Sequence, residues 1–133
     1  MLDVLTPPFD FHRILSHKRA MRKQLLARQD LLEKRIAIVS GSTIGEIKPL
    51  LELFLLNQGI RPVFYEGLYG SYYEDLTFGS PELAAFEPDV IVIHTSFRNL
   101  TDFPVPGMDA GDRERLLETS FERWQSMWEA AAD

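Results

Sequence analysis

One uninterrupted apolar run, residues 36–39 (IAIV), stands directly before a turn of small residues, 40–43 (SGST). A run that is apolar at every position is typical of a parallel strand covered on both faces, because an exposed face would require alternating polar residues. Residues 47–55 then show helical spacing of apolar side chains, and Gly59 is well placed to end that helix in the left-handed conformation. The three segments predict a strand, a tight turn and a helix of an α/β fold.

Two further short apolar runs, residues 62–65 and 90–93, complete the predicted sheet. Because helical segments separate the runs, we expect parallel strands with right-handed crossovers, the strand order 2-1-3 and helices on both faces. This is a three-layer α/β/α architecture of flavodoxin-like type. Sheets of this type usually hold four to six strands. Three strands therefore predict either a domain completed by another subunit or the front part of a longer multidomain chain.

Long helices are expected at both ends of the chain. Asp10 is a suitable N-cap for a helix running to about Glu33, with a narrow apolar stripe. The last helix is expected from about Gly111. Its apolar stripe is spaced by four, three, four and three residues: Leu117, Phe121, Trp124, Trp128 and Ala131. We therefore divide the chain into an N-terminal helical arm, residues 1–33, and an α/β domain, residues 34–133.

Two local patterns predict where other helices begin. Thr43 and Glu46 have the spacing of a capping box ahead of the helix at 47–55. Ser80-Pro81-Glu82 combines a capping hydroxyl, a proline at the first helical position and an acidic side chain near the positive end of the helix. That second helix should be short, because Pro88 ends it.

Composition excludes several classes of site and partner. The chain has no cysteine and only three histidines, so a disulfide, a thiol nucleophile and a cysteine zinc site are impossible, and we expect no metal site and no cofactor in this segment. Residues 1–35 carry eight Lys/Arg against four Asp/Glu, whereas residues 36–133 carry six against sixteen. The acidic body would repel phosphate backbones, which argues against nucleic acid as a partner. Apolar runs far shorter than a bilayer span and the lack of a signal peptide predict a cytoplasmic protein with no membrane association.

Chemistry is expected where the loops after the first and third strands meet, because parallel sheets bind ligands at the carboxyl ends of strands where strand order reverses. We take Ser42 as a candidate nucleophile and His94 as its base. The candidate ligand-binding residues are Ser40, Gly41, Thr43, Glu66, Thr95, Ser96, Arg98 and Asn99. Hydroxyls and free backbone N–H groups suit an anion, and a guanidinium suits a phosphate or carboxylate. The structural alternatives are that Ser42 and Thr43 cap a helix, that His94 is a hydrogen-bonded structural histidine, and that Arg98 pairs with Glu66.

Several linked segments resemble a known family. They are residues 34–43 (KRIAIVSGST), 51–56 (LELFLL), 64–66 (FYE), 72–75 (YYED) and 93–99 (IHTSFRN). Together they resemble the N-terminal region of FkbH-like proteins, subfamily IIIC of the haloacid dehalogenase (HAD) superfamily. The resemblance extends from about Asp10 over nearly the whole chain. It implies an SGNH-hydrolase-like domain placed ahead of a HAD catalytic domain. It also implies transfer of a glyceryl group from a phosphorylated three-carbon donor to an acyl carrier protein, or related steps in capsular polysaccharide or polyketide biosynthesis.

The catalytic blocks of both families are incomplete in this sequence. The HAD nucleophile motif, Asp-x-Asp-x-Thr/Val, is absent, so that chemistry does not reside in these residues. In the SGNH comparison, Ser42 matches the nucleophile, but Ser40-Gly41 stands where Gly-Asp is usual. Arg98 and Asn99 stand where an Asn-Asp block is usual, and the Asp-x-x-His block is missing. His94 would therefore be a substitute base from a different strand.

Three functions remain open on the sequence. The first is an accessory domain that binds a carrier protein, a phosphorylated ligand or a C-terminal HAD domain. The second is a weak serine esterase or acyltransferase that uses Ser42 and His94. The third is a self-association module in which the chain forms a homo-oligomer.

Overall fold

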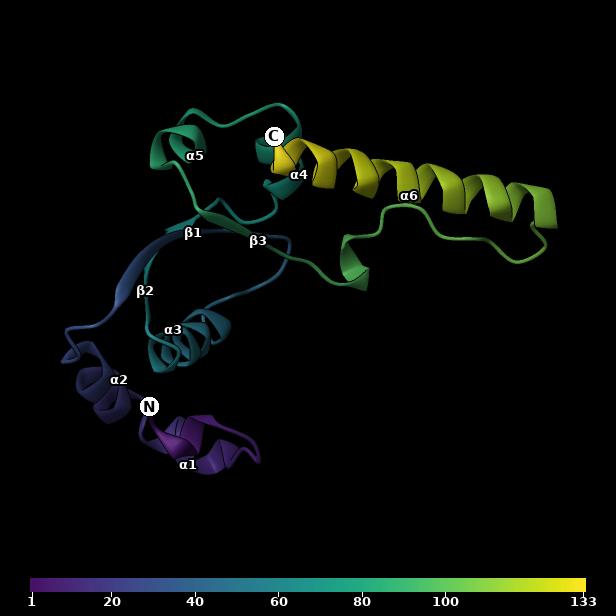
Figure 1. Ribbon diagram of the computed structural model, residues 1–133. Helices are drawn as coiled ribbons and strands as arrows, with labels where there is room; N and C mark the ends of the chain where they lie inside the picture. The colour runs from purple at the N-terminus through teal and green to yellow at the C-terminus, as the bar shows by residue number, and fades with distance from the viewer.

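The computed structural model describes all residues, 1–133. Its elements in chain order are η1 (Asp3–Leu5), α1 (Phe11–Ser16), α2 (Lys18–Leu26), β1 (Leu32–Ser40), α3 (Ile47–Asn57), β2 (Ile60–Glu66), α4 (Tyr72–Thr77), α5 (Pro81–Phe86), β3 (Val90–His94), η2 (Phe97–Asn99) and α6 (Ala110–Ala132). The N-terminal arm lies at one end of the molecule, and α6 projects from the opposite side (Figure 1). None of the helices is both long enough and apolar enough to cross a membrane.

The sheet has three parallel strands in the order β2-β1-β3, which confirms the predicted α/β fold and strand order. The central strand β1 pairs with both neighbours, and its residues from Ile36 to Ser40 are all buried. The uninterrupted apolar run thus occupies the one position in the sheet that is covered on both faces and both edges. The two outer strands are only partly buried.

Helices cover both faces of the sheet, as the sequence predicts. The arm and α3 lie on one side, and α4, α5 and α6 lie on the other (Figure 1). Each side has its own apolar core. The first core joins the arm to α3 through Leu5, Ile14, Met21, Leu25, Leu53 and Leu56. The second joins the sheet to the opposite helices through Ala37, Val39, Tyr72, Leu76, Leu83 and Met127.

The N-terminal helix is shorter than predicted and is divided into two. Asp10 caps it as expected, since its carboxylate accepts from the Arg13 N–H at 3.0 Å. The helix breaks at His17, whose φ of −117° and ψ of 16° depart from helical geometry. The Ser16 hydroxyl and the His17 ring bond the carbonyls of the preceding turn, which competes with the helical pattern. Beyond α2, pairing of Leu32 and Glu33 with β2 places these residues in β1 instead of in the helix.

The predicted capping box at Thr43 and Glu46 does not form. The N–H groups of Ile47 and Lys48 bond instead to the Ile44 carbonyl at 3.1 and 2.9 Å, so that α3 begins at Ile47 with no side-chain cap. A turn at Ile44 therefore delays the helix and leaves the Thr43 hydroxyl free.

Two other helix boundaries match the prediction. Ser80 caps α5 by accepting from the Leu83 N–H at 3.3 Å. Gly59 follows α3 with a φ of +84°, the left-handed conformation that glycine adopts at lowest cost.

Helix α6 buries only part of the predicted stripe, since Trp124 and Ala131 pack against the second core. Met127 is its one fully buried residue, and Trp124 packs against Tyr72 with ring centroids 5.9 Å apart. Three members of the stripe, Leu117, Phe121 and Trp128, are exposed. The second core is therefore centred on Met127 and covers only one side of the predicted stripe.

We expect Met127→Ala to lower the free energy of unfolding by about 3 kcal/mol, because it removes a fully buried side chain and leaves a cavity between α6 and the sheet. Chemical denaturation monitored by circular dichroism measures this change. Thr119→Ala, an exposed position on the same helix, is the control and should change stability by less than about 0.5 kcal/mol. Equal stability of both variants would show that α6 is not anchored through Met127.

Candidate functional site

Parallel pairing brings the ends of β1 and β3 together. The register pairs Ser40 with His94, and the Gly41 N–H donates to the His94 carbonyl at 3.0 Å. The turn after β1 and the loop after β3 therefore start side by side, as strand order predicted.

The Ser42 hydroxyl and the His94 ring are in direct contact. The Ser42 Oγ lies 2.8 Å from the His94 Nδ1, and both side chains are half-buried. A hydroxyl and an imidazole at this distance can exchange a proton. No hydrogen bond within the chain reaches the other ring nitrogen, Nε2, and no carboxylate pairs with the ring. The pair thus lacks the third group that orients the base in serine hydrolases.

Asn99 holds the two loops together. Its Nδ2 donates to the Gly41 carbonyl at 3.0 Å, and its Oδ1 accepts from the Ser96 N–H at 2.8 Å. The second bond belongs to a capping box between Ser96 and Asn99 at the start of η2. A Cβ atom at Gly41 would overlap the Asn99 side-chain amide. Glycine at position 41 is therefore required for this contact.

The two loops enclose a cleft of about 420 Å³. The residues predicted from the sequence that line it are Gly41, Ser42, Thr43, Ser96, Arg98 and Asn99. Arg98 is the only charged side chain among the lining residues, and it forms no ion pair. Hydroxyl groups and one free guanidinium favour an anionic group over a cation or an apolar ligand.

Four further lining residues were not chosen as site residues from the sequence: Tyr69, Gly70, Tyr72 and Thr101. The Gly70 N–H donates to the Ser40 carbonyl at 2.9 Å, which attaches the loop after β2 to the end of β1. Gly70 has a φ of +79°, a conformation that glycine adopts at low cost. A glycine shortly after β2 was therefore the available sequence signal of a tight turn at this edge.

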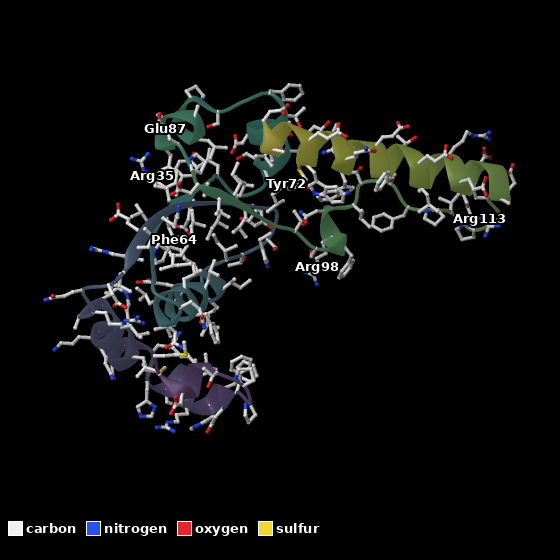
Figure 2. All side chains as sticks on the ribbon, viewed as in Figure 1. Arg35, Phe64, Tyr72, Glu87, Arg98 and Arg113 are labelled. Carbon is white, nitrogen blue, oxygen red and sulfur yellow. The ribbon has the colours of Figure 1, made fainter.

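Tyr72 connects the cleft to the second core. It is buried, and its ring stacks on Trp124 of α6. Figure 2 shows Tyr72 near the C-terminal end of this helix. Burial raises the pKa of the Tyr72 phenol above its ordinary value, and the nearby positive charge of Arg123 opposes this only in part. The neutral phenol is a hydrogen-bond donor, and Tyr72 is one of the residues that line the cleft.

Four predicted residues do not line the cleft. His94 contacts Ser42 but is not one of the lining residues. Ser40 is buried within β1, and Thr95 is half-buried after β3. Glu66 pairs with Lys48 at 3.0 Å and borders a separate hollow. The alternative ion pair between Arg98 and Glu66 therefore does not form, because α3 supplies the partner of Glu66.

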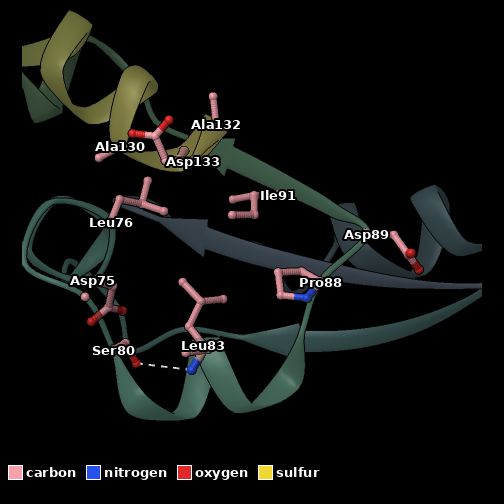
Figure 3. A pocket seen from close by; sticks show the side chains of 13 residues that line it. Asp75, Leu76, Ser80, Leu83, Pro88, Asp89, Ile91, Ala130, Ala132 and Asp133 are labelled. Atoms are coloured by element: carbon pink, nitrogen blue, oxygen red, sulfur yellow. Dashed lines mark hydrogen bonds between the residues drawn. The ribbon is translucent and has the colours of Figure 1, made fainter.

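A larger hollow of about 540 Å³ lies on the α4–α6 side of the sheet (Figure 3). Its walls include Leu76, Leu83 and Ile91, and none of the predicted site residues lies in it. Asp89, at its edge, already accepts from the Arg35 N–H at 2.7 Å. Pro88, Asp89 and Ile91 line the hollow from the start of β3, whereas the cleft lies beyond the end of that strand. No group of three or more His, Asp or Glu side chains in the chain is arranged to hold a metal ion.

Comparison with known proteins gives one structural match and no sequence match. No family model matches the sequence, and no curated protein matches it. The structure is similar to the crystal structure of the N-terminal part of protein BF1531 from Bacteroides fragilis, which contains a phosphatase domain complexed with Mg. The TM-score is 0.63 at 14% sequence identity, over 84% of this chain and 29% of that one. This chain thus shares the fold of a segment of a longer protein that contains a phosphatase domain.

We expect Gly41→Ala to destabilise the protein by about 1–3 kcal/mol, because the added methyl group displaces the Asn99 amide. In an Asn99→Ala background the same substitution should cost less than about 0.5 kcal/mol, since the clashing atoms are gone. Denaturation of the four proteins in this double-mutant cycle measures the coupling. Additive effects would show that Asn99 does not hold the turn after β1.

Proposed function

We propose that this chain is an accessory domain of the FkbH-like type that binds a phosphorylated ligand or an acyl carrier protein. It does not itself carry HAD chemistry. In this proposal the N-terminal arm ends where β1 begins, at Leu32, and the rest of the chain forms the SGNH-like domain that precedes a HAD catalytic domain in a multidomain chain. The proposal is supported by the fold shared with the N-terminal part of a protein that contains a phosphatase domain.

The observation that carries this proposal is the composition of the cleft. Arg98 is unpaired, and the hydroxyls of Ser42, Thr43 and Ser96 lie along the same cleft. A guanidinium binds two oxygens of a phosphate at once, and hydroxyls supply further donors to the same group. The volume of about 420 Å³ is sufficient for a phosphorylated three-carbon compound and is within the usual range for small-molecule sites.

We expect glycerol 3-phosphate to bind the protein and to shift NMR signals of Ser42, Ser96 and Arg98, whereas glycerol should not bind. Arg98→Ala should weaken binding at least about tenfold, since a charge-assisted hydrogen bond contributes about 1.5–3 kcal/mol. The matched control is Arg61→Ala, because Arg61 is also exposed and forms no ion pair. Equal affinity of both arginine variants, or no binding of the phosphorylated compound, would contradict the proposal.

A second function is favoured by the contact between Ser42 and His94. In a weak esterase or acyltransferase, the Ser42 Oγ forms a bond to the carbonyl carbon of an ester or thioester. His94 takes the hydroxyl proton and returns it to the alcohol or thiol that leaves. Without a carboxylate on the ring, we expect such activity to be far below that of a complete triad.

For this second function, Ser42→Ala should abolish hydrolysis of p-nitrophenyl acetate and of a short acyl thioester, while Ser126→Ala, at an exposed position on α6, should leave the rate unchanged. His94→Ala should lower the rate by a similar factor to Ser42→Ala, because the pair acts as a unit. Initial rates at pH 7–8 provide the measurement. A Ser42→Ala rate equal to that of the unmodified protein would exclude the hydrolase.

A further inference from the structure

Half of α6 has almost no contact with the rest of the molecule. The helix runs for 23 residues, and its N-terminal half projects from the body beside the loop that precedes it (Figure 1). Between residues 110 and 122 only Leu116 and Ser120 are partly covered, and the remaining side chains are exposed. Isolated helical segments of this length are marginally stable in water, so a packing partner would stabilise this half.

The projecting helix presents an apolar stripe to solvent. We call Leu117, Phe121 and Trp128 the α6 stripe; their exposed fractions are 67%, 57% and 50%. Phe121 and Trp128 pack edge to face with centroids 6.4 Å apart, which makes a continuous aromatic surface. Spacings of four and seven residues along one line match the contact line between two packed helices.

Glutamates follow one side of the α6 stripe. Glu114, Glu118 and Glu122 are exposed and form no ion pair. The helix and the loop before it, residues 102–133, carry eight Asp/Glu against three Lys/Arg. The chemistry of a matching partner is therefore an apolar surface edged with basic side chains.

The N-terminal arm has this chemistry. At the break between α1 and α2, a hollow of about 320 Å³ is lined by Leu15, Lys18 and Arg19. Phe11, one turn before Leu15, is exposed as well. Arg13 and Arg19 form no ion pair, so both charges are available to a partner.

We propose that a second copy of this chain occupies the α6 stripe, with the N-terminal arm of one copy docked on α6 of the next. The aromatic side chains of the stripe enter the hollow beside Leu15, and the glutamates pair with Arg13 and Arg19. The two surfaces lie at opposite ends of one molecule, so the contact forms only between copies (Figure 1). Such head-to-tail contacts are heterologous and produce rings or filaments.

The test is sedimentation velocity of the full chain over a concentration series at low and high salt. We expect species larger than a monomer that grow with concentration and diminish at high salt, because the pairing charges are exposed and screened. Glu118→Lys with Glu122→Lys should yield a monomer, as should Arg13→Glu with Arg19→Glu. Reversal of Glu74 and Glu82, which lie outside both surfaces, should leave assembly unchanged, and circular dichroism confirms that each variant is folded.

Mixing the two reversed proteins gives the decisive result. Each then offers a charge that is complementary to the other, so large species should return on mixing although each protein alone is monomeric. A monomer at every concentration of the unmodified chain overturns the proposal. The proposal is also wrong if either pair of charge reversals leaves assembly unchanged, or if the control variant loses assembly to the same extent. Failure of large species to return on mixing would contradict it as well.

Discussion

The pairing of β1 with β3 is the interaction on which the rest of the molecule depends. Its register places Ser40 beside His94, and this single alignment brings the two polar loops to the same edge of the sheet. The alignment is maintained because β1 is buried on both faces from Ile36 to Ser40, so that a shift along the strand would draw the exposed Arg35 into the buried stretch. Strand β1 therefore contributes to the apolar core and also positions the two loops that line the cleft.

Around that edge, short-range contacts determine the shape of the cleft. Asn99 bonds both loops at once, and it lies so close to Gly41 that no side chain fits there. Ser42 and His94 then meet at 2.8 Å, while Arg98 remains without an acidic partner. This combination is the reason that we propose ligand binding ahead of catalysis. The cation and the hydroxyls are in place, but nothing orients the imidazole for catalysis.

Charge is distributed along the molecule in a way that links the two ends. The basic arm is held to α3 by apolar packing and by ion pairs of Lys18 with Glu46 and of Arg22 with Glu52. The acidic α6 is anchored only near its C-terminal end, where Met127 is buried. One end thus carries excess positive charge and the other carries negative charge and exposed aromatic rings. This asymmetry is the basis for the proposed contact between copies.

Local sequence patterns determined the apolar centres of the three strands, the order 2-1-3, the caps at Asp10 and Ser80, and two of the loops that line the cleft. Each of these depends on features within a few residues or on the general geometry of parallel sheets. Only the tertiary structure decided which face of α6 is buried, that the capping box forms at Ser96 and not at Thr43, and that Lys48 engages Glu66. In each of these cases the sequence offers more than one possible helix face, cap or ion-pair partner. Contacts between residues that are distant in sequence select one of them.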